Sequence, residues 1–90
     1  MPEVGFTLNQ FKVGELGKIA AIQAETDLKQ RLAALGLRKG CLVHVLRKAS
    51  FGGPLHVRVG TTELILRLNE AKRIVATPQL DLTATQLRGT

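Results

Sequence analysis

One short segment in the second half of the chain alternates apolar and polar side chains with a period of two. Leu55, Val57 and Val59 are apolar, and His56 and Arg58 stand between them. A strand with one buried and one solvated face has this period, because successive side chains point to opposite faces. The fold must therefore pair this strand with others in a sheet.

The segments on either side supply candidate partner strands. Apolar residues are dense in 41–48, and 63–68 alternates again. A loop at 49–54 and a turn near Gly60 join these segments to the central strand. Short connections between consecutive strands are typical of antiparallel hairpins. The sequence therefore predicts a β-meander.

A helix is predicted over 26–35, ahead of the meander. Its apolar face would be formed by three leucines at i, i+4 and i+7, which are Leu28, Leu32 and Leu35. We expect Thr26 or Asp27 to cap the N-terminus. At the other end, Gly36 is expected in the left-handed conformation, with Leu37 folded back onto the helix.

Shorter elements complete the predicted order. They are a lead-in turn at 7–13, a largely buried strand at 18–24, a helical turn at 70–72 capped by Asn69, and a short strand at 74–77 that Pro78 stops. A small antiparallel barrel accommodates these elements, since closure removes exposed sheet edges. The predicted fold is mainly β with one inserted α-helix.

The length of 90 residues fits a single domain with one core. We expect the domain to span 1–78, and 79–90 to form a tail that is mobile unless it packs against this or a neighbouring copy. The single cysteine, Cys41, allows no internal disulfide, and the N-terminus lacks the apolar stretch of a signal peptide or membrane span. These features predict a cytoplasmic protein.

Positive charge is concentrated in the middle of the chain. The formal net charge is +6, and the whole excess falls within 38–73. The basic residues there are Arg38, Lys39, Arg47, Lys48, Arg58, Arg67, Lys72 and Arg73, against Glu63 and Glu70. Such a patch favours an anionic partner, whether nucleic acid, lipid headgroups or an acidic protein surface. The alternative is a solvated face that only aids solubility.

Cys41, His44 and His56 are the candidate metal ligands. Residues 41 and 44 of one strand would point to opposite faces, so the Cys-x-x-His spacing that works in a turn fails here. We therefore predict no metal site, with Cys41 buried and both histidines facing solvent or the basic patch.

Catalysis also lacks a sequence signature. Nucleophilic chemistry needs a serine or cysteine beside an oriented base, and nothing around Ser50 or Cys41 has that pattern. The sequence holds no P-loop run for nucleotide hydrolysis. We predict neither an enzyme nor a cofactor.

The loop at 49–54 is the most distinctive candidate for binding. Gly52 and Gly53 free the backbone and Pro54 restricts it, so Phe51 can be presented at a hairpin tip. The basic residues expected beside it are Arg47, Lys48 and Arg58. An apolar tip ringed by bases is typical of a protein-docking site. The alternative is that Phe51 folds back and caps the open end of the barrel.

Three motifs occur in order between about residues 7 and 77. The first is Arg31-Leu32-Ala33-Ala34-Leu35-Gly36-Leu37-Arg38-Lys39-Gly40, the second is Phe51-Gly52-Gly53-Pro54-Leu55, and the third is Leu66-Arg67 followed by Glu70-Ala71 and Ile74. In this order they resemble the FeoA family, the small cytosolic accessory proteins of bacterial ferrous iron uptake. Arg38-Lys39 departs from the family, in which many members have a small or apolar residue followed by proline.

The resemblance implies a small SH3-like β-barrel without enzymatic activity. It also implies an adaptor that contacts the ferrous iron permease FeoB through the permease's cytosolic GTP-binding region, and so meets the membrane only through that partner. On this reading Phe51 is the anchor, Arg47, Lys48, Pro54 and Arg58 surround it, and Lys29 and Arg31 on the helix offer a second surface. Self-association is also possible.

Two other readings compete with the adaptor. Iron- and manganese-dependent repressors carry the same barrel, but nothing before Phe6 could supply their winged helix-turn-helix. A basic nucleic-acid-binding barrel fits the net charge, although an aromatic content of 3% leaves few side chains on which bases could stack. Nucleic acid is therefore the less favoured partner.

Overall fold

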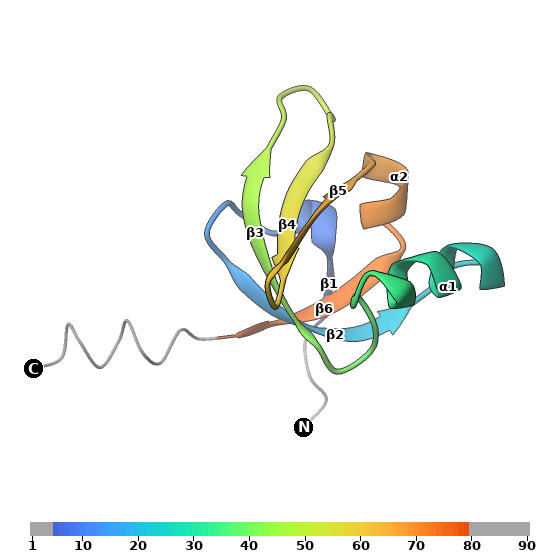
Figure 1. Ribbon diagram of the computed structural model, residues 1–90. Coiled ribbons are helices and arrows are strands. Elements are labelled where there is room, and N and C mark those ends of the chain that lie inside the picture. The colour runs from blue at the N-terminus through green and yellow to red at the C-terminus, as the bar shows by residue number, and fades with distance from the viewer. Residues whose placement is uncertain (1–4, 80–90) are drawn as a thin grey trace, which may run out of the picture.

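The computed structural model describes residues 5–79, which form one six-stranded antiparallel sheet with the strand order β1-β6-β2-β3-β4-β5. Its elements are β1 (Phe6–Thr7), the 3-10 turn η1 (Leu8–Gln10), β2 (Leu16–Ile22), α1 (Thr26–Ala34), β3 (Leu42–Lys48), β4 (Leu55–Val59), β5 (Thr62–Leu66), α2 (Leu68–Ala71) and β6 (Ile74–Gln79). The sheet curls into a small barrel, from which the β3–β4 hairpin projects at one end (Figure 1). The predicted mainly β fold with one inserted helix is confirmed, and a second helix of a single turn accompanies it.

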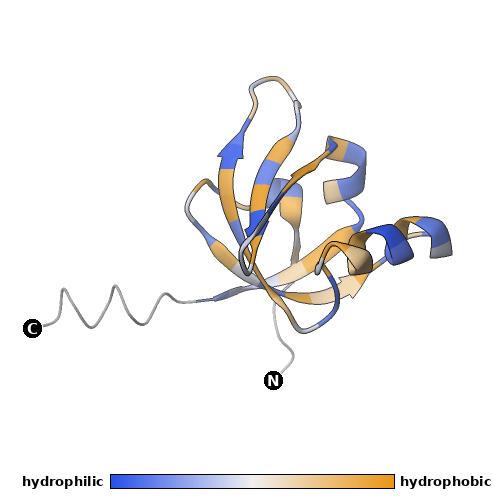
Figure 2. Ribbon diagram, viewed as in Figure 1, coloured by the Kyte–Doolittle hydropathy of each residue, from blue (hydrophilic) through white to orange (hydrophobic). Residues whose placement is uncertain are grey.

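Strand β4 has one buried and one solvated face, as its alternation of apolar and polar residues predicted. Leu55, Val57 and Val59 are buried in the core, and Arg58 is exposed on the outer face. Apolar and polar segments alternate along β4 in Figure 2. Among residues 5–79 every fully buried side chain is apolar, so the barrel is held by hydrophobic burial and by the hydrogen bonds of its ladders.

Helix α1 ends as predicted and begins differently. Gly36 has a φ of 98°, its N–H donates to the Ala33 oxygen at 2.9 Å, and the Leu37 N–H donates to the Leu32 oxygen at 2.9 Å, which is a Schellman end. At the other end the cap residue is Glu25, without a side-chain cap hydrogen bond. The predicted cap at Thr26 or Asp27 is therefore wrong, because both residues are already helical.

The apolar face of α1 is also narrower than predicted. Leu32 is buried and Leu28 packs partly against the core, but Leu35 is 43% exposed. Leu35 is the C-cap, with φ −91° and ψ 0°, so it has left the helical conformation that would align it with the other two. The Schellman turn places Leu37 in the core instead.

The shorter elements differ from their predicted bounds. The lead-in turn is β1 followed by η1, and the strand predicted at 18–24 is β2, two residues earlier. The cap of α2 is Arg67 and not Asn69, because the Glu70 carboxylate accepts the Arg67 backbone N–H at 3.0 Å.

Pro78 does not stop the last strand. Strand β6 continues through it to Gln79 and pairs Pro78 with Gly17 of β2. A proline is tolerated there because, within the described residues, β1 pairs only with Val75 and Ala76 of β6. The prediction of a mobile tail over 79–90 concerns residues that lie, apart from Gln79, outside the described part.

Phe11 lies in the core just after η1. A Cβ added to Gly17 would stand 2.7 Å from Cε2 of the Phe11 ring, so only glycine admits the ring at this point of β2. The Lys48 ammonium donates hydrogen bonds to the backbone oxygens of Asn9 at 2.8 Å and Phe11 at 2.9 Å. The N-terminal turn is thus attached to the end of β3, next to the loop of the β3–β4 hairpin.

Candidate protein-docking surface

The hairpin between β3 and β4 ends in a tight turn. The Gly53 N–H donates to the Ser50 oxygen at 3.3 Å, and the Ala49 N–H donates to the Pro54 oxygen at 3.0 Å. The two central residues, Phe51 and Gly52, have φ values of 58° and 76°. Positive φ at both central positions is the geometry of a type I′ turn, which usually selects Asn-Gly. This turn has phenylalanine in the place of asparagine.

The side chain of Phe51 is fully exposed. The alternative in which this ring caps the open end of the barrel is therefore wrong. A Cβ on Gly52 would lie 3.3 Å from Cδ2 of Leu68, so the glycine side of the tip faces α2 while Phe51 faces solvent. Neither burial nor backbone preference explains an aromatic residue at this position, and exposed apolar side chains on fixed turns are typical of binding sites.

The basic residues predicted around Phe51 do not all lie together. Arg47 is exposed at the tip end of β3, where it pairs with His56 of β4. Arg58 lies three residues along β4 from Leu55, about 10 Å at the usual strand rise. Lys48 is exposed but its ammonium is occupied by the N-terminal turn. Lys48 stands nearest the loop in the pairing of β3 with β4 but is engaged elsewhere, which leaves Arg47 and Pro54 as the predicted neighbours beside the tip.

Arg58 belongs to a separate polar row on the outer face. It pairs across the sheet with His44 of β3 and Glu63 of β5. A nitrogen of its guanidinium lies 3.5 Å from Nδ1 of His44, and Nε2 of His56 lies 2.8 Å from Oε1 of Glu63. The row combines both signs of charge, so Arg58 contributes less local positive potential than Arg47.

A shallow groove beside the tip contains Ile65, which the sequence analysis did not predict as a binding residue. It is lined in part by Arg47, Pro54, His56 and Ile65. Ile65 is 69% exposed and stands opposite His56 in the register of β4 and β5. The signal was present in the sequence, because Ile65 occupies a polar position in the alternation of 63–68.

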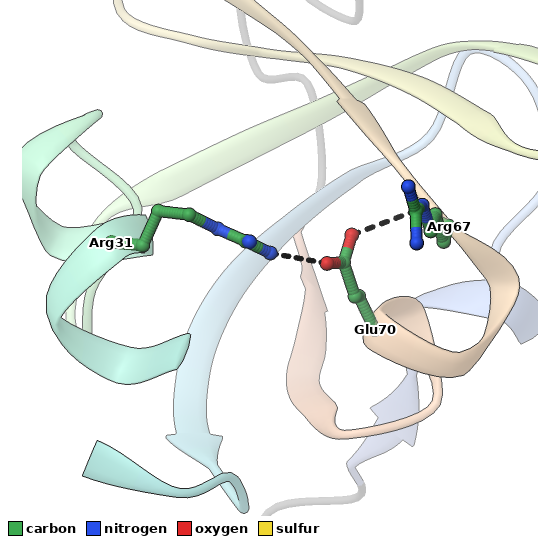
Figure 3. Close-up of polar contacts among 3 residues, drawn as sticks. All are labelled: Arg31, Arg67 and Glu70. Carbon is green, nitrogen blue, oxygen red and sulfur yellow. Dashed lines mark hydrogen bonds and ion pairs between the residues drawn. The ribbon is translucent and has the colours of Figure 1, made fainter. Parts of the chain in front are cut away.

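The two basic residues proposed on α1 face different surroundings. Arg31 forms an ion pair with Glu70, whose other carboxylate oxygen accepts the Arg67 backbone N–H (Figure 3). Arg31 therefore attaches α1 to α2. Lys29 instead lines a groove between α1 and β2. The structure does not bring Lys29 and Arg31 together as one surface.

The three candidate metal ligands do not form a cluster, and Cys41 is half-buried where the sequence predicted a buried residue. Cys41 packs partly against the core, and its sulfur accepts the Arg38 backbone N–H at 3.3 Å. His44 and His56 are half-buried on the outer face. Within 5–79 no three His, Cys, Asp or Glu side chains are grouped closely enough to hold a metal ion. Over the same residues, no helix is long and apolar enough to cross a membrane.

Comparison with known proteins supports the barrel and its family. Residues 6–78 match the family model of the FeoA domain. The solution structure of FeoA from Chlorobium tepidum is 32% identical, with a TM-score of 0.78 over 83% of this chain and 71% of that one. Among curated proteins, none matches the chain in sequence.

Two further solved structures share the fold. FeoA from Stenotrophomonas maltophilia, complexed with zinc, is 35% identical, with a TM-score of 0.69 over 79% of this chain and 88% of that one. It is described as a prokaryotic SH3 domain protein and a candidate ferrous iron transport activating factor. A manganese-dependent transcriptional repressor has a TM-score of 0.79 at 20% identity, over 88% of this chain and 44% of that one, which shows a shared fold alone. The SH3-like barrel is confirmed.

Proposed function

This chain belongs to the FeoA family, and we propose that it serves ferrous iron transport as a small adaptor that docks on the membrane permease FeoB. The contact is made with the cytosolic GTP-binding region of the permease. The adaptor works in the cytoplasm and reaches the membrane only through this partner. It changes the GTP cycle or the assembly of the permease by binding, and no bond is made or broken on the adaptor itself.

The exposed ring of Phe51 is the observation that supports this proposal most directly. Aromatic side chains contribute strongly to binding when a partner pocket removes them from water. The backbone of Phe51 is held by a hydrogen-bonded turn, so little backbone entropy is lost when the ring is bound. An exposed ring on a hydrogen-bonded turn therefore suits a docking anchor better than it suits any role in the stability of the barrel.

Arg47 and Pro54 extend the contact around the ring. Both are exposed and line the groove that also contains Ile65. A complementary partner presents an apolar pocket for Phe51 with acidic groups at its margin. Arg58 lies farther along the same face and accelerates the encounter through its charge, with little effect on the lifetime of the complex.

The test is an amide NMR titration of this protein with the soluble GTP-binding region of the permease at physiological salt. We expect shifts that are largest at 47–54. The double variant Phe51→Ala with Arg47→Glu should bind at least about tenfold more weakly, because it removes the anchor and reverses the nearest charge. Both side chains are exposed, so the variant should keep the amide spectrum of a folded barrel.

The matched control is Leu42→Ala with Arg73→Glu. Leu42 is an exposed apolar residue at the opposite end of β3, and Arg73 is exposed between α2 and β6. This control changes the same kinds of side chain away from the tip and should keep its affinity within about twofold. Equal affinities for the tip variant and the control would exclude the tip as the docking site.

A further inference from the structure

A groove runs between α1 and the C-terminal half of β2. Its floor consists of apolar side chains, which are the small Ala20, Ala21 and Ala33 and the larger Ile22. Figure 1 shows α1 lying beside this end of β2. The alanines leave room next to the backbone, so the floor can admit an extended chain as well as side chains.

The rim of this groove is basic. Lys29 of α1 and Arg38 and Lys39 of the following turn line it, and all three are exposed. None of them forms an ion pair among the residues that the structure describes. A second hollow shares Ala20 and Lys39 with the groove and adds Lys18. Neither hollow is lined by an acidic residue, so an uncompensated positive strip borders the apolar floor.

The floor also borders a strand edge. The pairing of β2 with β3 covers only Leu16 to Lys18, whereas its pairing with β6 continues to Ile22. A bulge falls between Ile19 and Ala21. Residues 20–22 therefore have a neighbouring strand on the β6 side alone within 5–79. An extended peptide can hydrogen-bond to such an edge and place alternate side chains on either side of it.

We propose that this groove docks an extended acidic segment of a protein partner. Carboxylates of the segment pair with Lys29, Arg38 and Lys39, while its small or apolar side chains lie on the alanine floor. A nucleic acid fits less well, because no aromatic residue lines the groove on which a base could stack. The surface is separate from Phe51 and its neighbours, so it does not depend on the function proposed for the hairpin tip.

The experiment uses the full chain and a capped decapeptide in which glutamate alternates with alanine or valine. Titration should shift the amides of 20–22, Ala33 and 38–40. The double variant Lys29→Glu with Lys39→Glu should lose at least about tenfold in affinity, because it turns two attractive contacts into repulsive ones. The control Lys12→Glu with Lys72→Glu makes the same change in net charge outside the groove and should lose no more than about twofold.

The variants are expected to fold, because Lys29 and Lys39 are exposed, and the amide spectrum of each free variant checks this. Lys39→Glu alone serves as a second, milder variant with an intermediate loss. A ten-nucleotide polyuridine should leave the groove amides unshifted at the same concentration. Equal losses in groove and control variants, peptide shifts elsewhere, or RNA shifts at 20–22 would overturn the proposal. The hairpin-tip variant should bind the decapeptide normally, which keeps the two tests independent.

Discussion

The N-terminal turn and the β3–β4 hairpin tip each present one phenylalanine, in opposite environments. Phe11 is 2% exposed and packs where β2 has a glycine, whereas Phe51 is fully exposed on a turn with positive φ. Burial of Phe11 removes a large apolar surface from water and stabilises the barrel. Phe51 gains nothing from burial and occupies a backbone conformation that costs free energy.

The difference separates a residue that stabilises the barrel by burial from a residue that is available for binding a partner. A chain with only three phenylalanines places one where no packing benefit results, so a partner supplies the missing contact in our interpretation. Changes at the two positions should therefore act on different observables: unfolding free energy at Phe11 and binding at Phe51.

The largest effect is expected for Phe11→Ala. Truncation of a buried aromatic ring leaves a cavity and should lower the free energy of unfolding by about 3–5 kcal/mol. Urea denaturation followed by circular dichroism measures this change. A loss below about 1 kcal/mol would mean that the site collapses around the cavity.

A smaller loss is expected for Gly17→Ala. The added Cβ would stand 2.7 Å from the Phe11 ring and 3.1 Å from Cβ of Ala76, so the ring must shift. Overpacking of this kind costs about 1–3 kcal/mol. In the double variant with Phe11→Ala the penalty should shrink, because the ring is no longer present and only the contact with Ala76 at 3.1 Å remains. Additive losses in that double-mutant cycle would show that the glycine acts independently of the ring.

The substitution Phe51→Asn should raise the free energy of unfolding, whereas the two changes above lower it. Asparagine tolerates the left-handed conformation, and Asn-Gly is the preferred type I′ pair, so the free energy of unfolding should rise by about 1 kcal/mol. Binding to the GTP-binding region should weaken at the same time. Destabilisation by Phe51→Asn would show that the ring contributes to the fold, and the contrast with Phe11 would fail.

The smallest effect is expected for Lys48→Met, which tests the link between the two regions. The methionine keeps an apolar stem and removes the hydrogen bonds to Asn9 and Phe11. Lys48 is exposed as a residue and both hydrogen bonds lie near the surface, so the loss should be about 0.5–1 kcal/mol. Hydrogen exchange at the amides of 8–12 should accelerate more than exchange in β4. Uniform acceleration would mean that Lys48 does not act locally.

Much of the barrel could be predicted from the spacing of apolar residues along the sequence. The alternation around Val57 and the leucine spacing of α1 are local signals, and local signals determine which face of an element is buried. Boundaries were less predictable. The cap at Glu25 and the passage of β6 through Pro78 depend on neighbouring strands and turns that sequence spacing does not encode.

The candidate site was predictable in part. The two glycines and the proline after Phe51 predicted a hairpin tip, but they left open whether the ring is exposed or caps the barrel. The positions of Lys48 and Arg31 depend on partners 37 to 39 residues away. Both side chains donate hydrogen bonds within the molecule, and a count of charged residues cannot distinguish them from side chains that make no such bonds. Ile65 was overlooked for a similar reason, since its exposure becomes meaningful only beside Arg47 and Pro54.

The ion pair between Arg31 and Glu70 has a consequence for solubility. Strand β5 is an edge of the sheet, and an open edge can template the addition of further strands and hence aggregation. Helix α1 lies beside that edge, since Arg31, Leu32 and Leu35 line one hollow together with Leu64 and Leu66. By attaching α1 to α2, the ion pair holds a helix beside this edge, and we expect that helix to hinder the addition of a further strand at high protein concentration.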